Sequence, residues 1–135
     1  MRITVDTNVL ISATFWYGDS HKIIELVEQK KLILVLSKNI LQEYSEVLEY
    51  DEIQEKIIDK NLDMKYTLHK LISLATIVEP TLRLDIVKDD SDDNRVLECA
   101  LEGQVDYIIT QDNHLLKLKQ FQNISIMTPT EFLSI

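Results

Sequence analysis

Short apolar runs recur along the chain with the length and composition of strands that are buried on both faces. They are rich in Ile, Val and Leu, and polar segments separate them. Such runs are typical of a parallel sheet that helices cover on both sides. The sequence predicts strands at residues 2–5, 32–36, 105–110 and 124–127, and a further strand at 75–79, at 82–87 or at both.

Between these runs, apolar residues repeat at the three- and four-residue spacing of amphipathic helices. Helices are expected at 9–13 behind a Thr7-Asn8 cap, at 21–31 behind Ser20, from Ser37 to about Glu49, over 51–74 in two pieces that break near Lys60-Asn61, and from near Ser91 to Glu102, where Gly103 ends the helix; shorter turns are expected at 115–116 and from Pro129. The alternation predicts an α/β three-layer sandwich around a largely parallel, five-stranded central sheet.

The composition narrows the class of protein. The chain has 135 residues, of which 45% are hydrophobic, so we expect a single domain over residues 1–135. Its two glycines, Gly18 and Gly103, lie far apart. Dinucleotide-binding loops and Walker phosphate loops need closely spaced glycines, so both are excluded. The single cysteine excludes an internal disulfide and any zinc cluster built from cysteines of this chain.

The charge balance limits how the chain could bind nucleic acid. Acidic residues outnumber basic ones by 23 to 14, which gives a formal net charge of −9. Nucleic acid would therefore have to be held by a local basic patch or by bound metal ions. The N-terminus lacks a signal-peptide pattern, and the longest plainly apolar run, residues 32–36, is far too short to cross a bilayer. We expect a cytoplasmic protein without a membrane partner.

Two aspartates follow predicted strands. Asp6 ends the first strand, and Asp112 lies just past the fourth. The carboxyl ends of parallel strands meet at one edge of the sheet, which is where α/β folds bind ligands. Taken singly, Asp6 could be only a helix cap and Asp112 only a turn residue. Together they predict a polar site at this edge.

The helix that begins near Ser91 adds a third acid. Its apolar stripe contains Val96, Leu97 and Ala100. Asp93 falls on the middle of that stripe and Asp92 near its edge, whereas Glu98 and Glu102 are predicted to face solvent. Acids in a first turn also favour the helix dipole. The dipole does not explain why Asp93 should point inward.

The helix from Ser37 adds a fourth acid. Glu43 flanks its apolar stripe, Glu46 lies farther round, and Glu49 is on the opposite side. Only Glu43 could reach a site roofed by this helix. On its own, a glutamate that flanks an apolar stripe is more often a solvated edge residue.

Four carboxylates at one sheet edge would repel one another. Two such groups about 4 Å apart cost on the order of 4 kcal/mol at an effective dielectric constant near 20. A cluster of this kind stays ionised only with a bound cation, and oxygen ligands suit Mg²⁺ or Mn²⁺. Because these ions also bind substrate phosphates, the cluster indicates phosphodiester hydrolysis.

Three segments resemble the motifs of PIN-domain nucleases. They are the opening Asp6-Thr7-Asn8-Val9-Leu10-Ile11, the acidic helix start Asp93-Asn94-Arg95-Val96-Leu97-Glu98-Cys99-Ala100, and the strand Tyr107-Ile108-Ile109-Thr110-Gln111-Asp112, which ends in Thr-x-Asp. Each motif is short, but their order and spacing match over the whole chain. The sequence is most similar to the stand-alone prokaryotic PIN proteins identified as toxins of toxin–antitoxin pairs.

The resemblance implies roles for particular residues. The acidic catalytic site of the family falls on Asp6, Glu43, Asp93 and Asp112, with metal held by the three aspartates. It also implies that Thr110 supports the site by hydrogen bonding and that Asn8 orders the first acid. Asp90 and Asp92 are the alternatives if the helix begins one turn differently.

The resemblance also implies an activity and partners. It implies a ribonuclease that depends on Mg²⁺ or Mn²⁺ and a small antitoxin protein that blocks its site. RNA contact would rest on the metal and on a local patch, for which Lys38, Arg95, Lys117 and Lys119 are the candidates, although each could equally be a solvated surface residue. His114, two residues past Asp112, could approach a phosphate, but a surface histidine is the simpler interpretation.

A homodimer is the predicted assembly. The segment Phe15-Trp16-Tyr17 and the apolar residues Ile53, Ile57 and Ile58 offer more apolar surface than a small domain is expected to bury. Two-fold dimers are the commonest assembly, and relatives with this fold commonly pair in this way. The aromatic segment could also be core or a platform for stacking bases.

Other functions fit less well. A haloacid-dehalogenase-type phosphatase needs Asp-x-Asp after the first strand, where this chain has Asp6-Thr7-Asn8, and a receiver domain needs an acidic pair there. The serious alternative is a PIN fold that serves as a non-catalytic RNA-binding or assembly module. Such a module has no need for four clustered carboxylates, so the sequence favours the enzyme.

Overall fold

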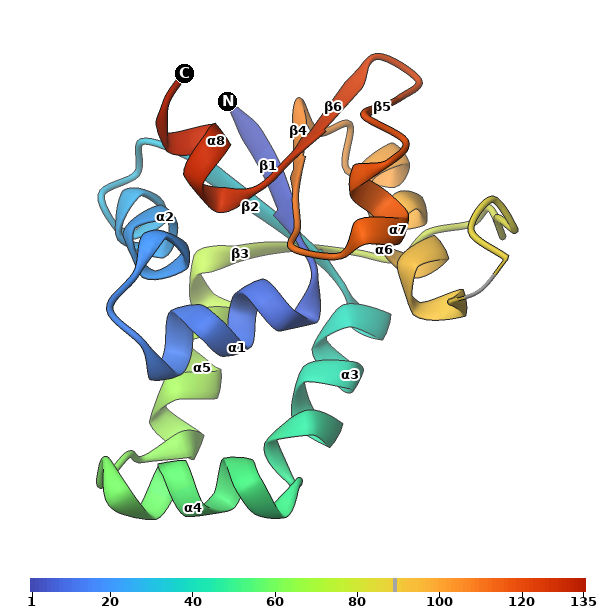
Figure 1. Cartoon of the computed structure of the whole chain (residues 1–135). Helices are drawn as coiled ribbons and strands as arrows, with labels where there is room; N and C mark the ends of the chain where they lie inside the picture. Colours follow the sequence, from blue (N-terminus) through green and yellow to red (C-terminus); the bar gives the residue numbers. More distant parts are fainter. Residues whose placement is uncertain (89) are drawn as a thin grey trace.

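A six-stranded sheet forms the middle layer of the computed structural model, which describes residues 1–88 and 90–135 (Figure 1). The strand order is β3-β2-β1-β4-β6-β5, and every pairing is parallel except that of β5 with β6. The strands are β1 (Arg2–Val5), β2 (Ile33–Ser37), β3 (Ala75–Val78), β4 (Tyr107–Ile109), β5 (Gln120–Phe121) and β6 (Ile124–Met127). The largely parallel sheet that the sequence predicts is confirmed.

The sheet differs from the prediction by one strand. Five strands were expected, and the structure adds β5, two residues that run antiparallel to β6. The turn between them uses Gln122 and Asn123, with φ of 47° and 69°. Two consecutive residues of positive φ are typical of tight hairpin turns, where glycine usually stands. The signal is therefore weak in this sequence, which has no glycine at the turn.

The third strand is β3 alone. Residues 82–87, the other candidate, form no strand because their backbone groups bond to side chains of α6 (Ser91–Glu102) instead of to a neighbouring strand. The Leu84 amide donates to Glu98 at 2.8 Å, and the Ile86 and Val87 amides donate to Asn94 at 2.9 and 2.8 Å. This segment therefore covers α6.

Helices cover both faces of the sheet (Figure 1). On one side α6 packs against β1, β2 and β4, and on the other α2 packs against α1 and α8. Helices α3 (Lys38–Leu48), α4 (Asp51–Asp59) and α5 (Met64–Leu74) form a U that extends away from the strands. The other helices besides α6 are α1 (Thr7–Phe15), α2 (Asp19–Glu28), α7 (Asn113–Leu116) and α8 (Pro129–Leu133).

Helix ends follow local chemistry, with three departures from the prediction. Asp6 caps α1 (Thr7–Phe15) in place of the expected Thr7-Asn8, and the other two departures concern Ser20 and Gly103. Ser37 caps α3 as expected, since its hydroxyl accepts from the Ile40 amide at 3.2 Å. Ser20 does not cap α2, because it lies buried within the helix and Gly18 precedes it. Gly103 ends α6, but with φ of −81°, and the left-handed conformation falls on Gln104.

Gly103 is needed for a different reason from the expected one. A Cβ atom at this position would overlap the Val35 side chain of β2. The end of α6 therefore lies so close to the sheet that only glycine fits. Arg2 reinforces this contact, since its Nε donates to the Gly103 carbonyl at 2.8 Å.

The strand order sets the position of the site. From β1 the chain builds β2 and β3 to one side, and β4 then lies on the other side of β1. The strand order thus reverses at the neighbouring strands β1 and β4, which form a switch point, and parallel sheets bind ligands beyond the carboxyl ends of such a pair. Asp6 follows β1 and Asp112 lies beyond β4, so both flank this point.

The aromatic segment before α2 divides between core and surface. Phe15 is buried, whereas Trp16 is 46% exposed and Tyr17 is 90% exposed. The Lys56 ammonium group of α4 lies 4.8 Å from the centre of the Trp16 ring. In α4, Ile53 is buried, but Ile58 is 76% exposed. An apolar surface therefore remains here. None of the helices among the described residues is long and apolar enough to cross a membrane.

Candidate functional site

Four acids that the sequence singled out line one small hollow at the switch point. Asp6, Glu43, Asp93 and Asp112 surround about 40 Å³ of space. They come from the end of β1, from α3, from the first turn of α6 and from the residue before α7. The other lining residues are Thr7, Asn8, Asp90, Asp92 and Val96.

Asp6 is held from two sides. It caps α1 through its Oδ1 atom, which accepts from the Val9 amide at 2.9 Å, and its Oδ2 atom accepts from the Thr110 hydroxyl. Burial raises the pKa of the Asp6 carboxyl group, while these two hydrogen bonds act in the opposite direction. The Asp6 side chain therefore both caps α1 and lines the hollow.

Thr110 connects the two strand-end aspartates. It is fully buried at the end of β4. Its hydroxyl donates to Asp6 and accepts from the Asp112 amide at 2.9 Å. Asn8 is arranged differently: it is exposed on the rim of the hollow, and no hydrogen bond joins it to Asp6 within the part of the chain that the structure describes. The order around Asp6 thus comes from Thr110 and from the start of α1.

Asp93 is a buried acid with other carboxyl groups beside it. It is 5% exposed, and its Oδ2 atom is buried without a hydrogen-bond partner among the described residues. Burial raises the pKa of the Asp93 carboxyl group, and the neighbouring Asp112 carboxyl group raises it further. Two carboxyl groups can hydrogen bond only with a proton on one of them, so an ionised pair needs a cation.

Glu43 faces the aspartates from α3. Its side chain is partly buried, whereas Glu46 and Glu49 are exposed. Burial raises the pKa of Glu43 to about 7, and the negative charge of Asp92 contributes in the same direction. The nearby Thr7 hydroxyl acts in the opposite direction. The helix phase read from the sequence therefore selects the one glutamate of the three that enters the hollow.

The first turn of α6 also brings Asp90 and Asp92 to the site. Asp90 caps the helix and accepts from the Asp92 amide at 2.9 Å. Asp92 is exposed, but partial loss of solvent around its carboxyl group and the charge of Asp90 both raise its pKa. With this cap, Asp93 remains the inward acid of the first turn. Asp89 lies outside the described residues.

Glu98 is buried, contrary to the prediction that it faces solvent. It is 2% exposed, and its carboxylate binds Arg95 at 2.9 Å and Arg83 at 3.6 Å. Helix phase alone misplaces it because residues 82–87 fold back over this side of α6. The other residue predicted to face solvent, Glu102, is exposed.

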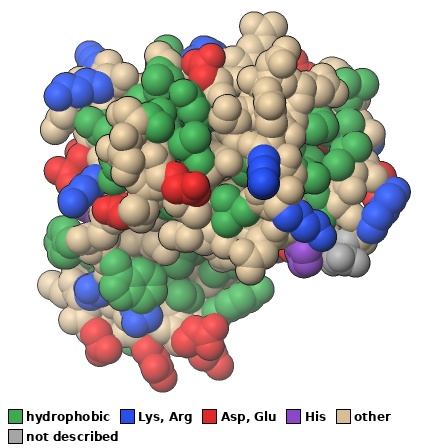
Figure 2. All heavy atoms as spheres, turned by 45° about the horizontal axis from the view of Figure 1, so that its top comes forward, with side chains coloured by type: hydrophobic (Ala, Val, Ile, Leu, Met, Phe, Trp, Pro, Cys, Tyr) green, Lys and Arg blue, Asp and Glu red, His purple; other side chains and the backbone are tan. Residues whose placement is uncertain are grey.

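The predicted basic residues do not form one patch. Lys38 forms an ion pair with Glu79, and Arg95 is engaged by Glu98. Lys117 and Lys119 are exposed and follow α7, the helix that Asp112 caps. On the face shown in Figure 2, Lys and Arg side chains stand in ones and twos among other residues.

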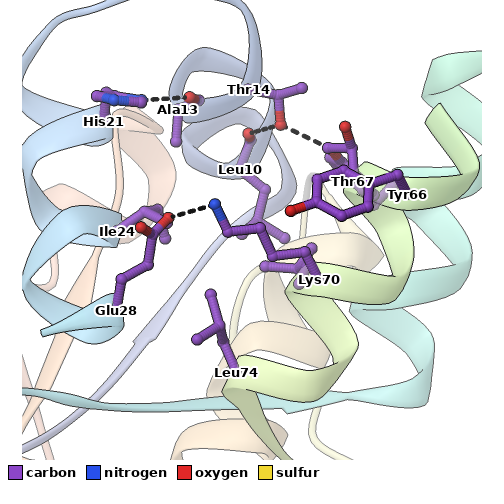
Figure 3. Close-up of a pocket in the computed structure, with 12 residues that line it drawn as sticks. Leu10, Ala13, Thr14, His21, Ile24, Glu28, Tyr66, Thr67, Lys70 and Leu74 are labelled. Carbon is purple, nitrogen blue, oxygen red and sulfur yellow. Dashed lines mark hydrogen bonds and ion pairs between the residues drawn. The ribbon is translucent and has the colours of Figure 1, made fainter. Parts of the chain in front are cut away.

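A larger apolar cavity lies elsewhere, between α1, α2, α3 and α5 (Figure 3). Its volume is about 190 Å³, and it shares no lining residue with the acidic hollow. Lys70 and Glu28 form an ion pair of 3.1 Å across it, as Figure 3 shows. The buried Tyr44 hydroxyl is 2.7 Å from that of Thr14. These four polar side chains are thus paired, and the lining residues contain no acidic cluster.

Comparisons with known proteins agree with the fold. VapBC2 from Rickettsia felis, solved with a DNA fragment from its promoter, is similar with a TM-score of 0.61 and 14% identity, over 93% of this chain and 97% of that one. PAE2754 from Pyrobaculum aerophilum has a TM-score of 0.59 and 15% identity, over 99% of this chain and 88% of that one. No curated protein matches the sequence significantly.

The sequence itself matches a family model. The match runs over residues 2–114, and the model describes the PIN domain. It includes both strand-end aspartates, Asp6 and Asp112, and the helices that carry Glu43 and Asp93. The chain belongs to the PIN domain family.

Proposed function

We propose that this protein is a metal-dependent endoribonuclease that hydrolyses RNA phosphodiester bonds and serves as the toxin of a toxin–antitoxin pair. The observation that carries the proposal is the hollow itself. Four acids converge there, and the buried Oδ2 atom of Asp93 has no hydrogen-bond partner among the described residues. A buried carboxylate oxygen without a donor is costly in free energy, and a cation would remove that cost.

The hollow fits a small divalent cation. Its ligands are carboxylate oxygens, which suit Mg²⁺ and Mn²⁺. About 40 Å³ leaves room for an ion and a few waters, since a water needs roughly 10–15 Å³ by this measure. We assign the metal to Asp6, Asp93 and Asp112. A bound ion would supply Lewis-acid polarisation of the phosphate oxygens.

Side chains and backbone groups of the protein would orient the metal ligands and the attacking water. Thr110 and the Val9 amide hold the Asp6 carboxylate in one orientation, and Thr110 also fixes the backbone of Asp112. Such preorganisation avoids the free energy of rearranging ligands during the reaction. Glu43, from α3, would orient the attacking water and accept its proton as the water oxygen bonds to phosphorus. The bond from phosphorus to the leaving oxygen then breaks, and that oxygen takes a proton from solvent.

RNA would be held by few basic groups. The net charge of −9 opposes binding over a wide surface. Lys117 and Lys119, which follow the helix that Asp112 caps, are the first candidates, while Lys38 and Arg95 would contact RNA only in exchange for their present carboxylate partners. We therefore expect a short contact around the scissile phosphate.

The partner proposal rests on resemblance. The motifs are similar to those of stand-alone prokaryotic toxins, and the fold is similar to that of VapBC2. We propose a small antitoxin protein as the partner that covers the site. Co-expression with the neighbouring reading frame should yield a complex that does not cleave RNA. Cleavage by the intact complex at the rate of the free protein would contradict this role.

We also propose a homodimer. Trp16, Tyr17 and Ile58 are exposed apolar side chains near α4, and exposed apolar surface commonly marks protein contacts. Light scattering over a concentration series should show a dimer that Trp16→Ala weakens. A monomer at every concentration would contradict the dimer. A dimer that Trp16→Ala leaves unchanged would exclude the aromatic segment from the contact.

Cleavage of labelled RNA tests the enzymatic proposal. The wild-type protein should cleave with Mg²⁺ or Mn²⁺ and stop with EDTA. Glu43→Gln should lower the rate by about 10²- to 10⁴-fold, the usual contribution of a general base. Glu46→Gln, an exposed residue one turn along α3, is the matched control and should change little. RNA binding without cleavage would instead support a non-catalytic RNA-binding module.

A further inference from the structure

His114 lies at the edge of the acidic hollow and has no part in the mechanism above. It belongs to α7, two residues after Asp112. Its Nδ1 atom is 3.6 Å from Asp112 Oδ1 and 3.8 Å from Asp93 Oδ2. Its side chain is 41% exposed, whereas that of Asp93 is 6% exposed. The imidazole ring therefore borders the hollow from the solvent side.

His114 and three neighbouring aspartates lie close enough together to bind one metal ion. Asp90, Asp93, Asp112 and His114 each offer one ligand atom, and these atoms all lie within 4.8 Å of one another. Oxygen and nitrogen ligands sit about 2.1 Å from a small divalent ion, so ligands on opposite sides of it are roughly 4.2 Å apart. Small side-chain rotations would bring the four atoms to that spacing.

A second observation points to the same place. The Asp93 oxygen that faces His114 is Oδ2, the buried atom without a hydrogen-bond partner among the described residues. Asp112 is oriented from the same short helix, because its Oδ1 accepts from the His114 amide at 2.7 Å. The backbone that places His114 thus also fixes one of the neighbouring carboxylates.

We infer that His114 supplies a nitrogen ligand to the cation assigned above to Asp6, Asp93 and Asp112, with Asp90 as a further oxygen ligand, and that the nitrogen makes the site prefer Mn²⁺ over Mg²⁺. The inference rests on the proposed function, since it concerns the same metal. Mg²⁺ is a hard ion that takes oxygen ligands and retains its waters. Imidazole nitrogen favours transition-metal ions. A purely carboxylate site would give no such preference from its ligands.

Pulsed electron paramagnetic resonance of the Mn²⁺-loaded protein detects the nitrogen directly. The echo modulation of wild-type protein should contain the ¹⁴N coupling of a bound imidazole. His114→Ala should lose this coupling, and His69→Ala, which removes an exposed histidine of α5, should keep it. Bound Mn²⁺ without ¹⁴N coupling in the wild type would overturn the inference, as would coupling that survives in His114→Ala.

Calorimetric titration with each metal alone tests the preference. His114→Ala should weaken Mn²⁺ binding by about tenfold, the size of effect expected for a perturbed metal ligand set. Its Mg²⁺ affinity should stay close to that of the wild type. Equal losses for both ions would overturn the selectivity. RNA cleavage is a separate readout: a protein that cleaves but shows no ¹⁴N coupling keeps its proposed function and loses only this inference.

Discussion

Two hollows of the molecule share the helices α1 and α3 and use them in opposite ways. The first turn of α1 lines the acidic hollow, while Leu10, Ala13 and Thr14 line the apolar cavity. On α3, Glu43 enters the first and its neighbour Tyr44 enters the second. A step of one residue along α3, and of two residues along α1 from Asn8 to Leu10, therefore separates the candidate chemistry from the packing.

The difference lies in how the polar groups are satisfied. In the apolar cavity, Tyr44 bonds with Thr14, and Lys70 pairs with Glu28. In the acidic hollow, burial and like charges raise the pKa of Glu43 and Asp93, and one Asp93 oxygen has no hydrogen-bond partner among the described residues. Strain of this kind is typical of functional sites, while satisfied groups contribute to stability.

The largest expected effect comes from removing a charge in the acidic hollow. Asp6→Asn should lower RNA cleavage by about 10³-fold or more, a barrier increase of roughly 4 kcal/mol. The reason is the loss of one carboxylate that would hold the metal. The same change at Asp51, an exposed acid at the start of α4, should leave the rate unchanged. Equal rates for Asp6→Asn and the wild type would remove Asp6 from the site.

A change in the apolar cavity should lower the stability of the protein and leave RNA cleavage unchanged. Leu71→Ala enlarges the cavity at a buried position of α5, and such truncations cost about 2–5 kcal/mol of unfolding free energy. Cleavage per folded molecule should not change. Leu82→Ala, at a position that is 62% exposed, is the control for chemical denaturation. A loss of cleavage in folded Leu71→Ala would show that the two hollows are coupled.

The smallest of these effects is a pH dependence of stability without metal. The unfolded chain loses the Glu43 proton near its ordinary pKa of 4.5, and the folded chain keeps it until about pH 7. Unfolding therefore releases a proton in this window, and stability should fall as pH rises from about 4.5 to about 7. In thermal melts with EDTA, the stability of the Glu43→Gln variant should fall less over this pH range than that of the wild type. An equal fall in both proteins would assign the effect to other groups.

The position of a residue around the helix axis predicts those site residues that lie on the longer amphipathic helices. The inward positions of Asp93 and Glu43 follow from the apolar stripes of α6 and α3, and those of Asp6 and Asp112 follow from strand ends. These signals are local and periodic. They are independent of which segment covers a helix from outside.

The remaining features depend on tertiary contacts that have no period. Glu98 is buried because residues 82–87 cover it, and the strand-like sequence of that segment does not reveal that it lies against α6. His114 lies on a helix of four residues, which is too short to define a face. The hairpin to β5 turns without glycine. In each case the sequence shows the residue but does not reveal which neighbour in space determines its role.

The thermal stability of Asp93→Asn with and without Mn²⁺ tests most directly the claim that the acidic hollow is built for a cation. In EDTA the variant should melt above the wild type, because repulsion falls and the new amide can donate to Asp112; about 1 kcal/mol corresponds to roughly 4 °C for a domain of this size. In saturating Mn²⁺ the order should reverse, because only the wild type gains the full binding free energy. A wild type that melts above the variant in EDTA and gains nothing from Mn²⁺ would contradict the account.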